Sequence, residues 1–299
     1  MKLSVVVSAY NEEKNIKECL ESVSFADEII LVNNSSSDKT EEIARKYTSK
    51  IFTRPNNIML NVNKNFGFTK AQGDWILSLD AEERASPGLV KEIKSAVKRD
   101  PKNAGFWIPR KNIIFGKWIE NDMWWPDYQL RLFKKGYGRF PEKHVHEYLK
   151  VRGDTEKLRS PLIHQNYKTV DQYIYKMLNI YVPSEVKNRQ NIKVGWIDSL
   201  RYPVNDFLKT FFLQKGYKDG LHGLVLSLLQ AFYMEIVFVK LWERQGFNKE
   251  NPRNFLTEIH EEFKVIKKEF GYWFLTSWIR ETKNPFKKIL LRLKRKRNT

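Results

Sequence analysis

The first hundred residues alternate between short apolar runs rich in β-branched residues and segments whose apolar residues recur at helical spacing. This alternation constrains the fold most, because successive strand–helix units with short links build a parallel sheet covered by helices. The apolar runs predict strands at 3–9, 28–33, 51–52 and 75–79. Between them we expect helices after Asn11, which suits an N-cap, from Asn61 to Ala71, and from Ser86-Pro87 onward.

Distinctive side chains follow three of the predicted strands at the point where each strand ends. Ala9 and Tyr10 close the first strand, Asn33 closes the second, and Asp80 follows the fourth. Ligands of open α/β sheets bind at the carboxyl ends of the strands. These side chains are therefore expected to share one site.

The pattern changes twice further along the chain. Residues 105–165 are richer in aromatic residues, glycine and proline, with strand-like pieces at 106–109 and 129–133, and from about 169 the pattern is helical. We therefore expect one domain over residues 1–168, with halves at 1–105 and 106–168. A helical, basic region is expected over 169–299.

An acidic motif, Asp80-Ala81-Glu82-Glu83, stands directly after the fourth predicted strand. Two carboxylates one residue apart at a strand end project towards one site. There they can hold Mg²⁺ or Mn²⁺ through hard oxygen ligands, and the metal neutralises a nucleotide diphosphate. The alternative is an acidic turn that caps the helix at Ser86, but the position within a βαβ frame favours the metal site.

Four segments in this order carry a resemblance to a known family: Val6 to Glu13, Val32 to Thr40, Asn65-Phe66-Gly67, and Gly73 to Glu83. The sequence resembles the inverting GT-A glycosyltransferases of family 2, whose corresponding motifs are A-Y-N-E, V-D-x-x-S-x-D-x-T, N-x-G and G-x-W-x-L-x-L-D-A-D-E. Downstream, Arg131-Leu132-Phe133, His146-Glu147 and His164 resemble the narrower group of lipopolysaccharide core β-glucosyltransferases. The resemblance implies an α/β fold, a GT-A (Rossmann-like) nucleotide-diphospho-sugar transferase domain with a helical C-terminal appendage.

The same resemblance implies a metal-dependent, inverting hexosyltransferase. Such an enzyme takes a nucleotide-sugar donor, here expected to be a UDP-hexose, with Mg²⁺ or Mn²⁺ as cofactor. It transfers the sugar to a hydroxyl of a cell-envelope glycan or glycolipid such as lipopolysaccharide core. Residues 1–105 would then bind the nucleotide-sugar, and residues 106–168 would lie on the acceptor side.

Family roles can be carried over residue by residue. The resemblance assigns the metal to Asp80, Glu82 and His164, and the donor to Ala9, Tyr10, Glu12, Asn33, Asn65, Asp80, Ala81 and Arg131. Glu82 replaces the second Asp of the D-x-D motif and keeps its charge. Asn33 replaces an Asp that accepts from uracil N3–H; it keeps a carbonyl acceptor but adds an NH₂, so the nucleotide base stays open. His164 is equally well explained as a buried hydrogen-bonding residue.

Inversion at the anomeric carbon requires a base that deprotonates the acceptor hydroxyl as it attacks. Two carboxylates beyond the acidic motif are candidates, Glu147 and Asp127. We prefer Glu147 because it follows the strand that carries Arg131, as the base of the family tends to do. The alternative for Glu147 is a structural ion pair with Arg131 or Arg139.

The formal charge of +18 and the pI of about 9.7 predict an anionic partner. A nucleic-acid-binding protein would fit this charge, but the sequence contains no helix-turn-helix or RNP motif. A sugar nucleotidyltransferase would carry a Gly-rich, Arg-containing loop where this chain has Ala9-Tyr10-Asn11-Glu12, and an oxidoreductase would carry G-x-G-x-x-G there. The predicted partners are a nucleotide-sugar and a glycan or glycolipid acceptor, without nucleic acid.

The apolar stretch from Leu221 to Trp242 is long enough to span a membrane, but Glu235 and Lys240 make spanning costly. A helix in the membrane interface fits better, aided by the basic residues from Lys283 onward on anionic lipid. The alternative is a buried helix with a solvated basic segment. The single cysteine and an N-terminal apolar run too short for a signal peptide predict a cytoplasmic location, with peripheral contact at the inner face of the cell membrane.

Overall fold

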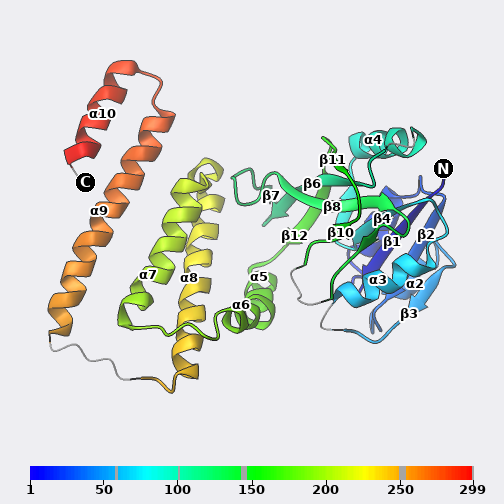
Figure 1. Ribbon diagram of the computed structural model, residues 1–299, viewed down its shortest axis with the longest axis horizontal. Helices are drawn as coiled ribbons and strands as arrows, with labels where there is room; N and C mark the ends of the chain where they lie inside the picture. Colours follow the sequence, from blue (N-terminus) through cyan, green and yellow to red (C-terminus); the bar gives the residue numbers. More distant parts are fainter. Residues whose placement is uncertain (58–59, 100–101, 143–146, 249–253, 298–299) are drawn as a thin grey trace. The chain divides into compact units, whose positions relative to one another are not determined.

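The computed structural model describes residues 1–299 except 58–59, 100–101, 143–146, 249–253 and 298–299 (Figure 1). The chain forms two compact units, which are described separately. Unit 1 comprises Met1–Trp118 and Trp124–Lys168, and unit 2 comprises Ile119–Met123 and Thr169–Thr299. The predicted domain over residues 1–168, with its halves at 1–105 and 106–168, stays a prediction, and the short piece 119–123 belongs to the second unit.

The first half of unit 1 is a parallel sheet in the strand order β3-β2-β1-β4. Its strands are β1 (Leu3–Ala9), β2 (Glu28–Asn33), β3 (Ile51–Thr53) and β4 (Trp75–Asp80). Both faces of the central strands are covered, which is why they are nearly continuous apolar runs rather than alternating ones. The predicted βαβ arrangement is confirmed for this half.

The sheet then continues with strands of mixed direction, in the order β4-β8-β6-β12-β5. β8 is antiparallel to β4, β6 is antiparallel to β8, β12 is parallel to β6, and β5 is antiparallel to β12. These strands are β5 (Glu83–Ala85), β6 (Gly105–Ile114), β8 (Asp127–Lys134) and β12 (Leu162–Tyr167). Smaller strands complete the unit: β7 (Lys117–Trp118) and β11 (Thr155–Lys157) on β6, and the pair β9 (Gly138–Arg139) and β10 (Lys150–Val151).

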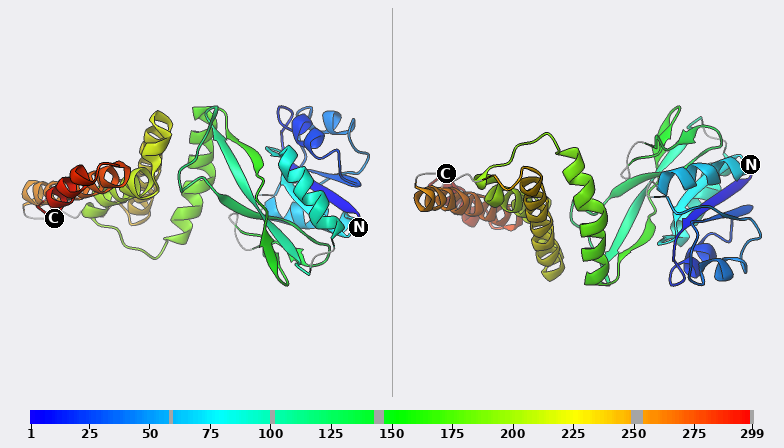
Figure 2. Two further views of the ribbon diagram at one scale, coloured as in Figure 1. Left: turned by 90° about the horizontal axis from the view of Figure 1, so that it is seen from above. Right: turned by 90° about the horizontal axis from the view of Figure 1, so that it is seen from below.

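Helices cover both faces of the sheet (Figures 1 and 2). Val5, Val7 and Ala9 of β1 belong to one core cluster, with apolar residues of α1 (Ile16–Ser22), α2 (Thr40–Ala44) and α4 (Pro87–Lys98). Val6 belongs to a second cluster with residues of α3 (Leu60–Lys70). Odd and even positions of one strand thus bury into opposite layers, as the period of two requires.

Two predicted helix starts had different outcomes. Ser86 caps α4 as expected, since its Oγ accepts from the Leu89 amide at 3.3 Å and Pro87 takes the first helical position. The prediction of Asn11 as an N-cap is wrong. Asn11 has a left-handed backbone (φ 53°), its Oδ1 accepts from the Ser37 amide at 2.9 Å, and α1 begins only at Ile16. Its side chain joins two loops because Asn tolerates the left-handed region.

Unit 2 is helical, as predicted for the chain from residue 169. Its elements are α5 (Val170–Lys176), η1 (Met177–Tyr181), α6 (Val182–Asn188), α7 (Trp196–Phe207), η2 (Leu208–Leu213), η3 (Gly216–Asp219), α8 (Leu221–Arg244), α9 (Phe255–Glu281) and α10 (Pro285–Arg297). The buried Asp219 carboxylate accepts from the amides of Glu120 and Asn121, both at 3.0 Å. This explains why residues 119–123 pack with the second unit.

α8 is the one described helix long and apolar enough to cross a membrane by length and composition. A third of its apolar window is buried within the structure, and helices α7 and α6 contact it. Such a helix is equally typical of a protein core, so the membrane position of α8 stays a prediction.

Candidate active site

The residues predicted at the strand ends lie at one edge of the parallel sheet. Ala9 is the register partner of Asn33 on β2, and Ser8 is the register partner of Asp80 on β4. Neighbouring strands lie about 4.8 Å apart, so the ends of β2, β1 and β4 line one short edge of the sheet. This is the carboxyl edge, where α/β sheets bind their ligands.

The loops after β1 and β2 are joined to each other by hydrogen bonds. The amide of Asn11 donates to Ser36 Oγ at 3.0 Å, and the amide of Glu12 donates to Thr40 Oγ1 at 2.7 Å. Tyr10 between them is 44% exposed, so its ring remains available to a ligand. The two loops therefore form one wall beside the strand ends, with an aromatic ring at its rim.

Asn33 is buried, and both groups of its amide are bound within the chain. Its Nδ2 donates to Glu41 Oε2 at 2.6 Å, and its Oδ1 accepts from the Ser36 amide at 3.0 Å. The hydrogen bond from Asn33, followed by that from Arg45, lowers the pKa of Glu41. Asn33, which stands where the family has an Asp, thus donates a hydrogen bond to the Glu41 carboxylate. An Asp at this position would repel that carboxylate instead.

The acidic motif sits among buried cations. Asp80 Oδ1 lies 2.5 Å from Lys64 Nζ, and Asp80 Oδ2 lies 2.7 Å from Arg131 Nη2. The same Arg131 nitrogen donates to Glu83 Oε1 at 2.8 Å, and the Asp80 amide donates to Glu83 Oε2 at 3.0 Å. Burial alone would raise the pKa of Asp80, but Lys64 and then Arg131 outweigh it and hold that pKa well below its usual range.

The cluster extends to the first of the two candidate bases. Arg110 Nε and Nη2 both donate to Asp127 Oδ2, at 2.8 and 2.5 Å, and Arg110 Nη1 lies 3.6 Å from Glu83 Oε1. Asp127 Oδ1 accepts from Gln129 Nε2 at 2.8 Å. Burial opposes ionisation of Asp127, but Arg110 prevails and lowers the pKa of this carboxyl. Both carboxylate oxygens are thus already hydrogen-bonded within the chain.

The second candidate base, Glu147, lies near the start of α3. Its Oε2 accepts from the Glu142 amide at 2.7 Å and from Asn61 Nδ2 at 3.4 Å. The alternative ion pairs of Glu147 with Arg131 or Arg139 do not form among the described residues: Arg131 pairs with Asp80 and Glu83, and Arg139 with Glu142 at 3.3 Å. His146, which carried part of the resemblance, lies outside the described residues.

Three polar side chains of α3 connect these parts. Asn61, Lys64 and Asn65 stand at i, i+3 and i+4, so they share one face of the helix. Asn61 reaches Glu147, Lys64 reaches Asp80, and Asn65 binds the 140–142 turn through Phe140 N and O and Glu142 Oε1. The amide of Asn65 is therefore occupied within the chain, and its direct contact with a donor stays a prediction.

The predicted metal ligands divide into two places. Glu82 Oε2 and His164 Nε2 lie 3.8 Å apart, whereas Asp80 is bound by the two cations. Within the described part of the chain, no three His, Cys, Asp or Glu side chains gather as a metal-ligand group. The structure thus places Glu82 beside His164. Asp80 could join them as a third metal ligand only by giving up its contact with Lys64 or Arg131.

The tautomer of His164 suits a ligand. Asn112 donates its NH₂ to Trp124 O at 2.9 Å, so its Oδ1 is the acceptor that lies 2.7 Å from His164 Nδ1. Nδ1 therefore donates to Asn112, and Nε2, on the side of Glu82, is the ring nitrogen that can bind a metal. A carboxylate oxygen and an imidazole nitrogen whose ring is oriented by Asn112 are a donor set that Mn²⁺ accepts, so these residues fit the predicted ion.

Lys64, Arg110 and Asn112 were missed by the sequence analysis. Arg110 and Asn112 stand at i and i+2 of β6, so they share one face of the sheet. Lys64 directly precedes the Asn65-Phe66-Gly67 motif and shares its helix face. These spacings were visible in the sequence, but only the structure shows that Lys64 reaches Asp80 from α3 and that β6 brings Arg110 and Asn112 beside Glu83 and His164.

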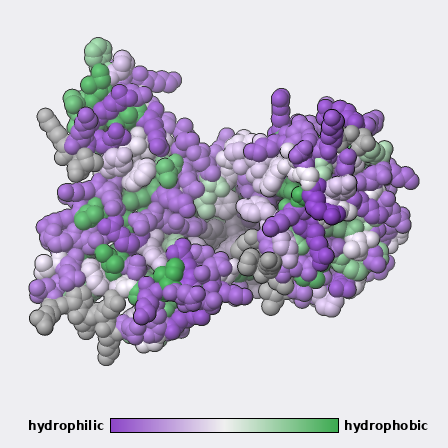
Figure 3. Space-filling model, viewed as in Figure 1, coloured by the Kyte–Doolittle hydropathy of each residue, from purple (hydrophilic) through white to green (hydrophobic). Residues whose placement is uncertain are grey.

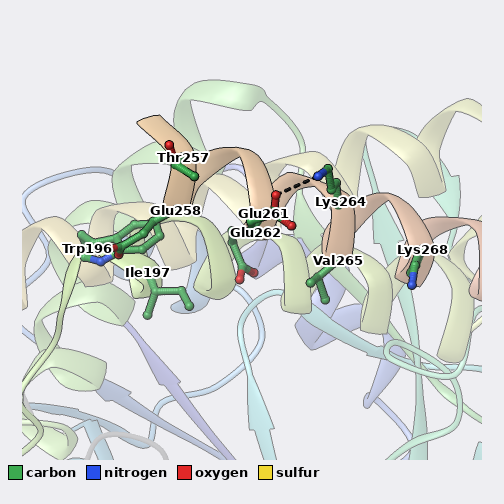
Figure 4. A pocket seen from close by; sticks show the side chains of 9 residues that line it. All are labelled: Trp196, Ile197, Thr257, Glu258, Glu261, Glu262, Lys264, Val265 and Lys268. Carbon is green, nitrogen blue, oxygen red and sulfur yellow. Dashed lines mark hydrogen bonds and ion pairs between the residues drawn. The ribbon is translucent and has the colours of Figure 1, made fainter. Parts of the chain in front are cut away.

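A pocket of about 470 Å³ lies elsewhere, in unit 2, between the start of α7 and α9 (Figure 4). It is lined by Trp196, Ile197, Thr257, Glu258, Glu261, Glu262, Lys264, Val265 and Lys268. Glu261 pairs with Lys264 at 2.7 Å, and Glu262 pairs with Arg201. Three glutamates make this pocket unsuited to a nucleotide diphosphate, so the strand-end cluster remains the candidate site.

Comparisons with known proteins identify the family of the first unit. Residues 4–149 match the family described as glycosyl transferase family 2. The lipopolysaccharide core biosynthesis glycosyltransferase LpsC of Rhizobium meliloti is 24% identical over 256 residues, which cover 82% of this chain and 93% of LpsC. A dolichol-phosphate mannosyltransferase of Pyrococcus furiosus is 30% identical over 145 residues, 46% of this chain and 39% of that protein. Among solved structures, a fragment of S. aureus TarS aligns with a TM-score of 0.44 and 18% identity over 82% of this chain and 92% of that one. Residues 4–149 are thus a glycosyltransferase family 2 domain in a GT-A-like α/β fold, and the chain is a glycosyltransferase that resembles the lipopolysaccharide core group.

Proposed function

We propose that this enzyme transfers a hexose, with inversion, from a UDP-sugar to a hydroxyl of a cell-envelope glycan or glycolipid. The observation that carries the proposal is the position of Asp80 at the carboxyl edge of β4, at the same sheet edge as Ala9 and Asn33 and held between Lys64 and Arg131. The similarity to LpsC, a protein named for lipopolysaccharide core biosynthesis, supports the acceptor class. Nucleic acid is not among the proposed partners.

The charges of the cluster support a metal-bound diphosphate. Ion pairs link three carboxylates (Asp80, Glu83, Asp127) with three cations (Lys64, Arg110, Arg131), so this part of the site is balanced. Glu82 and His164 Nε2 lie beside it and would hold Mg²⁺ or Mn²⁺, together with Asp80. When bound, the ion would neutralise the charge that develops on the leaving diphosphate.

The residues of the chain then have distinct tasks. The 10–13 and 34–40 loops would hold the nucleoside, with the exposed ring of Tyr10 against it. Lys64 and Arg131, already aimed at Asp80, would contact the diphosphate as fixed positive charges. Because both oxygens of Asp127 are held by Arg110 and Gln129, we assign the base to Glu147 and a positioning role to Asp127.

The proposal is tested by thermal shift with a panel of nucleotide sugars and Mn²⁺, since ligand binding to the folded state raises the melting temperature. UDP-hexoses should raise it, and both Asp80→Ala and a chelator should abolish the rise. Asp74→Ala is the matched control: Asp74 is an acid just before β4, at the opposite edge, where it accepts from the Lys2 amide at 2.7 Å. A donor-induced rise that survives Asp80→Ala and chelation would refute the metal assignment.

The acceptor class gives the enzyme a reason to work at a membrane. We propose a cytoplasmic location with peripheral contact at the inner face of the cell membrane. The formal charge of +18 favours contact with anionic lipid.

A further inference from the structure

Helix α10 (Pro285–Arg297) exposes a continuous apolar stripe. Phe286, Ile289, Leu290 and Leu293 are 82%, 54%, 67% and 54% exposed. They stand at i, i+3, i+4 and i+7, which places all four on one face of the helix. Figure 3 shows hydrophobic surface gathered over this part of unit 2, at the top left.

A different face of α10 packs on α9. Leu291 is buried in a small cluster with Leu275 and Ile279 of α9, and Arg295 Nη1 donates to Thr276 Oγ1 at 3.1 Å. At 100° per residue, Leu291 lies on the side of the helix away from the stripe. The helix is therefore oriented by its own unit, with the apolar stripe directed outward.

Basic residues border the stripe on both sides. Lys287 and Lys294 lie along one border and Arg292 and Lys296 along the other, and no Asp or Glu occurs between residues 282 and 299. Lys287 Nζ lies 5.2 Å from the centre of the Trp278 ring of α9. Trp278 and its neighbour Phe274, whose rings are 5.7 Å apart, are both exposed and extend the apolar surface beyond α10.

We propose that α10 lies in the surface of an anionic lipid bilayer and anchors the enzyme there. The stripe of α10 would enter the boundary between headgroups and acyl chains, and the bordering lysines and arginines would reach the lipid phosphates along their apolar stems. A nucleic acid offers the charge but no apolar surface for the stripe. The combination of an outward apolar face with cations on both borders fits an anionic membrane, and it moves the predicted membrane contact from α8 to α10.

The sequences of the two helices support this change. α8 also exposes apolar residues, including Leu228 and Phe232, but the helix carries Glu235, and Lys240 pairs with Glu243 at 2.7 Å. Acidic groups weaken attraction to anionic headgroups, whereas α10 contains none. The inference deepens the membrane contact of the proposed function without depending on glycosyl transfer.

The test is cosedimentation of the full chain with vesicles of phosphatidylcholine, alone or with about one third phosphatidylglycerol. The parent should bind the anionic vesicles far better. Leu290→Gln with Leu293→Gln should lower this affinity on the order of 100-fold, because two inserted side chains are lost. Lys287→Gln with Lys294→Gln should lower it roughly fivefold per cation.

The matched control is Leu228→Gln with Phe232→Gln, which makes the same kind of change on the exposed side of α8. This variant should bind like the parent. Loss of binding in the α8 variant but not in the α10 variant would overturn the proposal, as would equal binding to neutral and anionic vesicles. All variants should melt like the parent, because Leu291 is unchanged; no donor or acceptor is present, so failure here leaves the proposed transfer reaction untouched.

Discussion

Arg131 is the buried cation that joins Asp80 to Glu83, and replacing it by methionine tests whether the cluster holds the site together. Methionine keeps an apolar stem of similar length but cannot pair with a carboxylate. Arg131 is 5% exposed and Glu83 is fully buried. Arg131→Met would therefore leave a carboxylate in the interior with fewer compensating charges.

The size of the effect follows from the remaining partners. Removing one partner of a buried ion pair costs about 3–5 kcal/mol. Glu83 would keep Arg110 at 3.6 Å and the Asp80 amide at 3.0 Å, and Asp80 would keep Lys64 at 2.5 Å. These contacts favour the lower end, about 3 kcal/mol, which corresponds to a fall of about 6–12 °C in the melting temperature.

The loss should also depend on pH. The folded state lowers the pKa of Asp80, so ionised Asp80 stabilises the fold above its unfolded pKa, and this contribution is lost as the pH falls through the folded pKa. Arg131→Met removes one of the two cations that hold this pKa down. Acid unfolding of the variant should therefore begin at a higher pH than in the parent.

Melting curves by circular dichroism at neutral pH and along an acid series measure both effects. Whole curves must be compared, because the two units need not melt together. Arg139→Met is the control: its side chain is 76% exposed, and its pair with Glu142 at 3.3 Å lies at the surface, so no measurable change is expected. If Arg131→Met melts within about 2 °C of the parent, the ion pairs only offset their own desolvation and the reasoning is refuted.

Four further substitutions test the base, the nucleotide wall and the packing of α3. Glu147→Gln should keep donor affinity and lose transfer, while Asp127→Asn should retain part of it; a dead Asp127→Asn beside an active Glu147→Gln would move the base to Asp127. Asn33→Asp would set two carboxylates against each other at the 2.6 Å contact with Glu41, so donor affinity measured by titration should fall, most strongly at neutral pH. Gly67→Ala would press a Cβ within 2.5 and 2.8 Å of side chains of β1 and β2 and should cost about 1–3 kcal/mol in urea unfolding; an unchanged midpoint would show that α3 shifts freely.

The parallel half of the sheet could be predicted because its signals are local. Each strand is an apolar run, each helix has its own periodicity, and short links dictate that neighbours are parallel. For the same reason, the sequence was enough to predict that Ala9, Asn33 and Asp80 lie at one edge, because each follows or ends a predicted parallel strand.

The second half could not be derived in this way. β8 enters between β4 and β6, and β12 joins β6 to the three-residue strand β5, which follows the acidic motif directly. The pairings of β4 with β8, β6 with β12 and β12 with β5 link residues about 50 to 80 positions apart, and strand direction there is set by the whole sheet rather than by a link. The family resemblance therefore identified Arg131 and His164, but the sequence did not show that they contact Glu83 and Asn112.

The register of β12 shows how the acidic motif could serve both the proposed metal site and the buried ion pairs. His164 is opposite Glu83 on β5 and opposite Asn112 on β6, so one residue stands between the acidic turn and the strand that carries Arg110. Side chains alternate along the turn, and the buried Glu83 is committed to Arg131 while Glu82, its neighbour, points to the side of His164. Glu83 would then stay paired with Arg131 when the donor enters, while Glu82, together with the diphosphate, would compensate the charge of the incoming metal. Because these charged side chains are already in place, they would need to move little when charge develops on the diphosphate during transfer.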